Sequence, residues 1–136
     1  MGHEFLAGET VLAFDLETTG ISTNSDRIVQ IALVGSDSSG EPVNYEHLIN
    51  PRRAIPNGAS GVHGIFDSDV KGLPDFSNYA EQIHEMVEGA VIVGHNVRKF
   101  DMPMLDNEFR RIGKLPPRPK AIMDTCQLEI ILINSK

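Results

Sequence analysis

The sequence has a single cysteine, no long apolar run and no excess of positive charge. Because Cys126 stands alone, an intrachain disulfide is excluded, and a reducing compartment is consistent with the composition. No stretch approaches the roughly 18 apolar residues of a transmembrane helix, and the N-terminus lacks the charged start and apolar middle of a signal peptide. We therefore expect an intracellular, soluble protein, cytoplasmic or nuclear, with no membrane partner.

The net charge of -7 argues against tight nonspecific duplex binding, because that mode depends on broad neutralisation of phosphates. The charge is uneven, however: the segment from Arg98 to Lys120 has a local balance of +4. This segment is a candidate surface for phosphates, although a solvated helix face followed by a polar loop explains it equally well.

The chain has 136 residues, of which 40% are hydrophobic, so it is long enough for one domain with a real core. Short links join the first three predicted strands, which indicates an antiparallel meander. Strands then alternate with helices, a pattern typical of parallel pairing. We therefore predict an α/β fold with a mixed five-stranded sheet flanked by helices. The predicted strands are 11–16, 27–36, 43–49, 90–93 and 121–123, and the predicted helices are 60–64, 74–88 and 100–112, with one more beginning at Thr125.

Two carboxylates lie one residue apart at the end of the first apolar run, in the stretch Phe14-Asp15-Leu16-Glu17. Residues i and i+2 of a strand share a face and lie roughly 6.6 Å apart, so Asp15 and Glu17 point the same way. Two like charges at the rim of an apolar sheet repel each other unless something positive lies between them. A divalent metal ion is the natural candidate.

A third carboxylate, Asp101, follows a strand that we expect to neighbour the first one. Ligation by oxygen atoms alone suits Mg²⁺ or Mn²⁺ rather than Zn²⁺. Two such ions about 4 Å apart can activate water and stabilise the leaving oxygen of an in-line displacement. The predicted reaction is metal-assisted hydrolysis of a phosphodiester.

Three ordered motifs are spread over nearly the whole chain: Phe14-Asp15-Leu16-Glu17-Thr18-Thr19-Gly20, Val62-His63-Gly64-Ile65, and Gly94-His95-Asn96 with Phe100-Asp101. They closely resemble the motifs of the DEDD family of 3′-to-5′ exonucleases, which share the RNase H-like fold. The nearest relatives look like the proofreading epsilon-type and TREX-type branches, in which a histidine is the general base.

The resemblance implies roles for individual residues. Asp15, Glu17 and Asp101 match the catalytic, metal-binding carboxylates. It also implies two Mg²⁺ or Mn²⁺ ions in a complete site, a single-stranded DNA or RNA 3′ end as substrate, and a nucleoside monophosphate as product. The residues that match substrate-binding positions are Thr18, Gly20, His63, Ile65, His95, Asn96 and Phe100.

The sequence departs from the family pattern in two places. Three residues, 97–99, separate His-Asn from Phe-Asp, where the epsilon-type pattern has two and the TREX branch has a similar three, so both branches stay open. The third motif, His followed five residues later by Asp, is absent, so we expect one exonuclease domain over 1–136 that lacks the C-terminal helix, with a truncated sequence as the simplest explanation. The alternative is a noncatalytic exonuclease fold that binds nucleic acid or protein. Asp124 is expected to cap the helix at Thr125 rather than to bind metal.

Overall fold

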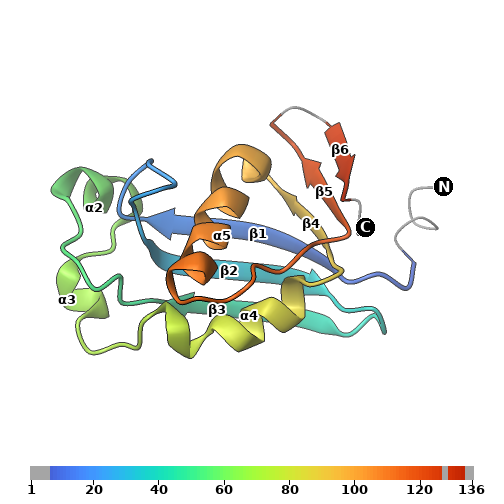
Figure 1. Ribbon diagram of the computed structural model, residues 1–136, viewed down its shortest axis with the longest axis horizontal. Coiled ribbons are helices and arrows are strands. Elements are labelled where there is room, and N and C mark those ends of the chain that lie inside the picture. Colours follow the sequence, from blue (N-terminus) through green and yellow to red (C-terminus); the bar gives the residue numbers. More distant parts are fainter. Residues whose placement is uncertain (1–6, 127–128, 134–136) are drawn as a thin grey trace.

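The strands of the computed structural model, which describes residues 7–126 and 129–133, form one six-stranded sheet. The order across the sheet is β3-β2-β1-β4-β5-β6 (Figure 1). β1 pairs antiparallel with β2 and parallel with β4, so the predicted change from a meander to parallel strands is confirmed. The strands are β1 (Val11–Thr18), β2 (Ile28–Ser36), β3 (Pro42–Leu48), β4 (Val91–Gly94), β5 (Ala121–Asp124) and β6 (Glu129–Leu132).

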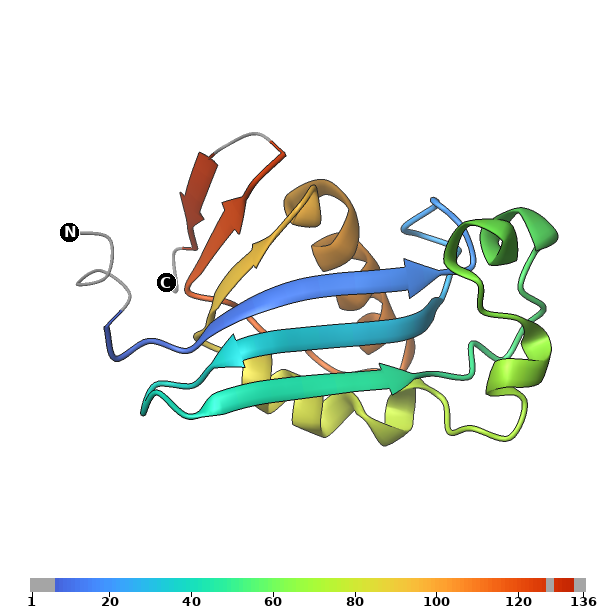
Figure 2. The ribbon, with the colours of Figure 1, turned by 180° about the vertical axis from the view of Figure 1, so that it is seen from behind.

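The helices lie mainly on one face of this sheet. α4 and α5 cover that face in Figure 1, whereas Figure 2 shows the opposite face of β1, β2 and β3 with none of the described helices in front of it. None of the helices in 7–126 or 129–133 is long and apolar enough to cross a membrane. The helical elements are α2 (Asn57–His63), α3 (Asp67–Val70), the 3₁₀ turn η1 (Phe76–Asn78), α4 (Ala80–Val87), the π-helical turn η2 (Val97–Asp101) and α5 (Met102–Arg111).

The end of the described chain differs from the prediction. The sheet was expected to have five strands, but a sixth strand, β6, pairs antiparallel with β5. The helix expected to begin at Thr125 is replaced by a turn. The N–H groups of Thr125 and Cys126 donate to the Gly94 carbonyl and the Asp124 carboxylate, which holds a turn in place of a first helical turn. The β-branched residues Ile130 and Ile131 then favour an extended strand that can pair with the otherwise unpaired edge of β5.

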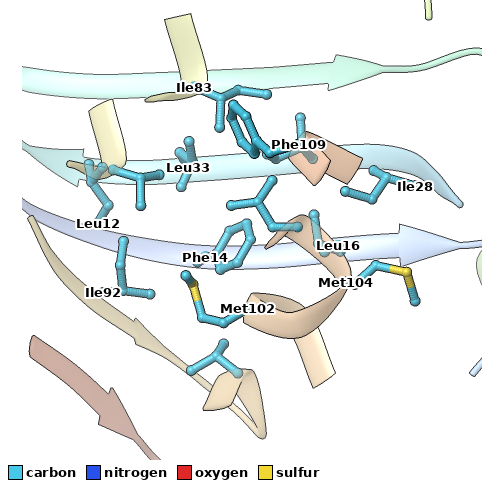
Figure 3. Close-up of a cluster of buried hydrophobic side chains, with 14 of the residues drawn as sticks. Leu12, Phe14, Leu16, Ile28, Leu33, Ile83, Ile92, Met102, Met104 and Phe109 are labelled. Atoms are coloured by element: carbon cyan, nitrogen blue, oxygen red, sulfur yellow. The ribbon is translucent and has the colours of Figure 1, made fainter. Parts of the chain in front are cut away.

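The core forms between β1, β2 and the two long helices. Leu12, Phe14 and Leu16 alternate along β1 and are buried on the helix-covered face (Figure 3). Phe109 of α5 is fully buried in the same cluster and makes an edge-on contact with Phe76, with ring centroids 5.0 Å apart. This packing fixes α5, and with it the turn that precedes α5, against β1 and β2.

Replacing Phe109 by Ala should lower the free energy of unfolding by about 3–5 kcal/mol, because it leaves a cavity between α5 and the sheet. Urea denaturation followed by circular dichroism measures the change. Leu115→Ala is the matched control, since Leu115 is 83% exposed and its loss should cost under about 0.5 kcal/mol. Equal losses for the two variants would contradict this description of the core.

Candidate functional site

Asp15 and Glu17 lie on the face of β1 opposite the core. The strand alternates between buried Phe14 and Leu16 on one side and the two carboxylates on the other, so both acidic side chains point away from the helices. Asp15 is exposed and Glu17 is half-buried. The prediction that the two carboxylates share a face is therefore confirmed.

Asp101 reaches the same region from the end of η2. β4 pairs only with residues 11–13 of β1, so the later part of β1 has no strand partner on that side. The N–H of Leu16 donates to the Asp101 carboxylate in place of a strand bond. Asp101 is only 6% exposed, and burial, followed by the charge of Asp15, raises its pKa to about 7.

The three carboxylates therefore repel one another through space. Glu17 and Asp124 add to the rise in the pKa of Asp101, and burial and Asp15 raise the pKa of Glu17. His63 acts on Glu17 in the opposite direction. Desolvated like charges of this kind favour a bound cation, and all-oxygen donors suit a hard divalent ion. Within the described residues no three His, Cys, Asp or Glu side chains stand at ligating spacing, so the carboxylates are gathered without being closed around one point.

A cavity of about 360 Å³ opens beside Glu17. Four predicted substrate residues, Thr18, Gly20, His63 and Phe100, line it. Ile21 and Val62, which the sequence reasoning missed, also line it and are 90% and 86% exposed. Large apolar side chains left in water beside a motif are the signal that could have identified them. The remaining lining residues are Leu16, Glu17, Thr19, Gly58 and Ala59.

The other three predicted substrate residues lie outside this lining. Ile65 is buried in a second apolar cluster with Val29 and Val70. His95 is exposed, and its ring contacts the Thr125 hydroxyl at 3.5 Å. Asn96 occupies the left-handed backbone region with φ 59° and begins η2. The positions of His95 and Asn96 favour shaping of the backbone before Asp101 over direct contact with a nucleotide in the cavity.

One wall of the cavity, residues 18–21, is held by Asp26. The Asp26 carboxylate accepts the Thr19 hydroxyl at 2.7 Å and the Ser22 N–H at 2.9 Å. A Cβ on Gly20 would lie 2.5 Å from the nearer Asp26 oxygen, so only glycine lets the backbone approach this closely. Glycine at position 20 is thus explained by packing against Asp26.

The same loop is held from behind by side chains that bind its carbonyl groups. Arg111 donates to the carbonyls of residues 24 and 26, Asn107 to the carbonyl of 23 and Arg53 to the carbonyl of 25. Arg111 also pairs with buried Glu108 at 3.3 Å. Lys120 pairs with Glu9. Part of the basic segment 98–120 therefore serves the protein's own structure instead of forming a surface for phosphates.

His63 joins α2 to the end of β1 with both ring nitrogens. Its Nδ1 accepts the Ile65 N–H at 3.1 Å, so Nε2 carries the proton and donates to the Thr18 carbonyl at 3.0 Å. Protonating Nδ1 would remove the acceptor of the Ile65 N–H. His63 is therefore suited to holding the two walls of the cavity together and poorly suited to acting as a general base.

Comparisons with known proteins agree with this geometry. The family model RNase_T, described as exonuclease, matches residues 12–133. The chain is 37% identical over 131 residues to a DNA polymerase III subunit epsilon-like protein of Rhodobacter capsulatus, and 34% identical over 120 residues to DNA polymerase III subunit epsilon of Treponema pallidum. These matches cover 93% and 88% of this chain but only 18% and 54% of the relatives, so the chain spans at most about half of their length.

Among solved structures, the fold is similar to Escherichia coli exonuclease I in complex with a dA16 oligonucleotide, with a TM-score of 0.69 and 26% identity. This match covers 79% of the chain and 25% of exonuclease I. The mixed sheet flanked by helices is the RNase H-like fold of nuclease domains. The chain belongs to the DEDD family of 3′-to-5′ exonucleases.

The stability of the metal-free protein should fall as pH rises from about 4 to about 8. The folded-state pKa of Asp101 is raised to about 7, so its contribution is fully present below the unfolded pKa near 3.8 and is lost as pH rises through 7. Asp101→Asn should reduce this fall by about 1–4 kcal/mol. Urea titrations at pH 5 and pH 8 with a chelator measure it, and an unchanged pH dependence in the variant would refute the assignment.

Gly20→Ala should destabilise the fold by about 1–3 kcal/mol, because the new methyl group overlaps the Asp26 carboxylate. Gly72→Ala is the matched control: a Cβ there meets nothing within 4 Å and the backbone φ is ordinary, so that variant should be neutral or slightly more stable. Thermal unfolding of both variants gives the comparison. A neutral Gly20→Ala would show that Asp26 does not constrain the loop.

Proposed function

We propose that this domain hydrolyses phosphodiester bonds one nucleotide at a time from the 3′ end of single-stranded DNA or RNA, with Mg²⁺ or Mn²⁺. The observation that carries the proposal is the cluster of Asp15, Glu17 and Asp101, of which Glu17 also lines a cavity of about 360 Å³. That volume lies in the range of small-molecule sites, which suits one terminal nucleotide. Glu17 belongs both to the carboxylate cluster and to the cavity wall, so the bond to be cut lies where the two meet.

The proposed roles of the residues fall into two groups, metal binding and contact with the terminal nucleotide. Asp15, Glu17 and Asp101 would hold the metal ions, which would supply water activation and stabilisation of the leaving oxygen. Thr18 and Gly20 give a backbone wall that admits the sugar of the terminal nucleotide closely, since the Thr18 hydroxyl turns back to the Gly20 carbonyl at 2.7 Å. Ile21 and Val62 present apolar surface at the same cavity, where a base can stack.

Support for a single-stranded substrate comes from the fold neighbour that was solved with a dA16 oligonucleotide. A half-enclosed cavity admits a base only when that base is unpaired, which also favours single strands. The release of a nucleoside monophosphate follows from cutting at the first bond from the end.

A second candidate is a binding domain without turnover. The observation that favours it is the state of the histidines near the cluster: His63 uses both ring nitrogens within the protein, and His95 lies exposed at the start of the turn that leads to Asp101. A domain whose three carboxylates are not served by His63 as a base could still bind a metal ion and a strand end.

The exonuclease assay uses a 5′-labelled single strand with Mg²⁺ or Mn²⁺, so that cutting from the 3′ end yields a ladder of successively shorter labelled products. Asp15→Asn should lower the rate by at least about a hundredfold, because it removes one metal-binding charge without altering the strand. Glu46→Gln is the matched control, since Glu46 lies on the same sheet face two strands away, where its carboxylate accepts the Gln30 side-chain amide at 3.5 Å.

Equal rates for the parent and Asp15→Asn would rule out the proposed site. Binding of the labelled strand without any shortening, at all metal concentrations, would favour the second candidate. A strand blocked by a 3′ hairpin should resist cutting, because its terminal base is paired.

A further inference from the structure

The turn that carries Asp101 contains one residue more than an α-helical turn. The N–H of Met102 donates to the Val97 carbonyl, five residues back, which defines the π-helical turn η2. A π turn inserts one residue into a helix while leaving the following turns in phase. The three-residue spacer 97–99 between Asn96 and Phe100 is therefore absorbed in η2, so that Asp101 still faces β1.

The entry to this turn is tightly constrained. Asn96 has φ 59° and ψ 26°, a left-handed conformation that few residues other than glycine and asparagine adopt at low cost. A Cβ on Gly94 would lie 2.8 Å from the Phe14 carbonyl oxygen and would also overlap the Val97 side chain. The backbone at 94–96 is thus pressed against β1, and its direction sets where η2 begins.

The carboxylate of Asp124 holds the start of η2 from the neighbouring strand. Its Oδ1 accepts the N–H groups of Asn96 and Cys126, each at 2.9 Å, and its Oδ2 accepts the N–H of Arg98 at 3.1 Å. Asp124 is 2% exposed and lies at the end of β5, opposite Gly94 in the parallel pair. The expectation that Asp124 caps a helix at Thr125 is wrong, because its carboxylate binds the N–H groups at the start of η2 and in its own turn.

We propose that Asp124 is a positioning residue for the carboxylate cluster: by binding the Asn96 and Arg98 N–H groups it fixes the π turn that delivers Asp101 to Asp15 and Glu17. The inference rests on the proposed metal-binding function of those three residues. Three backbone donors bind the Asp124 oxygens, and this geometry favours an effect on a metal ion through the turn. Positioning groups behind metal ligands typically change metal affinity by about 10–100-fold.

Asp124 also carries a negative charge that acts on Asp101, so position and charge must be separated. Asp124→Asn removes the charge and one acceptor while keeping the shape. Asp124→Glu keeps the charge but moves the acceptors by one methylene group. If position matters, both variants should bind Mn²⁺ at least about tenfold more weakly than the parent.

The affinity is measured directly by electron paramagnetic resonance of free Mn²⁺, without nucleic acid and without turnover. The matched controls are Asp37→Asn and Asp37→Glu. Asp37 also accepts two backbone N–H groups in a turn, at 2.9 and 3.0 Å, but it lies in the exposed β2–β3 hairpin away from the cluster. Both Asp37 variants should bind Mn²⁺ as the parent does.

An Asp124→Glu variant with parental affinity would overturn the proposal, because charge alone would then explain any loss in Asp124→Asn. Hydrogen exchange gives a second readout: the Asn96 and Arg98 amides should exchange faster in both Asp124 variants, and unchanged exchange would also overturn it. If the parent itself binds no Mn²⁺, or if Asp15→Ala binds it equally well, the proposed function fails. In that case the exchange rates alone decide whether Asp124 holds the turn.

Deletion of Lys99 tests the π turn independently. Lys99 is exposed, and removing it should convert η2 to an α-helical turn, so that α5 stays in phase and Mn²⁺ affinity stays close to that of the parent. Deletion of exposed Glu85 is the control, since it rotates the following part of the regular helix α4 by about 100° and should destabilise the fold. A folded Lys99 deletion that binds Mn²⁺ tenfold more weakly would contradict the role assigned to η2.

Discussion

The alternation of side chains along β1 is the constraint on which the rest of the structure depends. β1 lies inside the sheet, between β2 and β4, with apolar side chains on one face and the two carboxylates on the other. Leu12, Phe14 and Leu16 bury one face under α4 and α5, and this burial forces Asp15 and Glu17 onto the other face. A shift of one residue in the register of β1 would turn Asp15 and Glu17 toward the core and the apolar side chains toward the other face. The register that buries the core is therefore also the one that presents the carboxylates.

The unequal lengths of the strands bring the third carboxylate into place. β4 ends after pairing with the first residues of β1, so the Leu16 N–H has no partner in β4. This N–H donates a hydrogen bond to the Asp101 carboxylate. The chain turns out of β4 through Gly94 and Asn96, and Asp124 at the end of β5 holds that turn. Asp101 of η2 therefore lies near Asp15 and Glu17 of β1, at the edge where the parallel strands β1, β4 and β5 end.

The walls of the cavity beside the carboxylate cluster are held by polar side chains of the protein itself. The half-buried side chains of Asp26, Asn107 and Arg111 hold the loop after β1 through hydrogen bonds. His63 ties α2 to the Thr18 carbonyl on the other side. His63 and Arg111, which the sequence alone makes candidates for contact with substrate or phosphate, bind carbonyl groups of the cavity walls instead, because part-buried carbonyl groups need hydrogen-bond partners.

Local patterns in the sequence determined a large part of this structure. Apolar runs predicted β1 and β4, alternation of apolar and polar residues predicted β3, and Asp15 and Glu17 share a face because strand geometry leaves no other choice. The family followed from three ordered motifs, and the comparisons confirm it. The sixth strand was missed because a short apolar segment such as 129–132 is compatible with helix or strand until the partner edge of β5 is known.

Only the tertiary structure decided how the remaining site residues are used. Thr18, Gly20, His63 and Phe100 meet in one cavity although they come from three separate segments, whereas Ile65, His95 and Asn96 lie outside it. The role of Asp124 depends on N–H groups 28 and 26 residues earlier in the chain, which are its neighbours only because β5 pairs with β4. Sequence fixes local periodicity and residue chemistry, but contacts between distant segments arise from packing, and here those contacts place the acid at the end of η2.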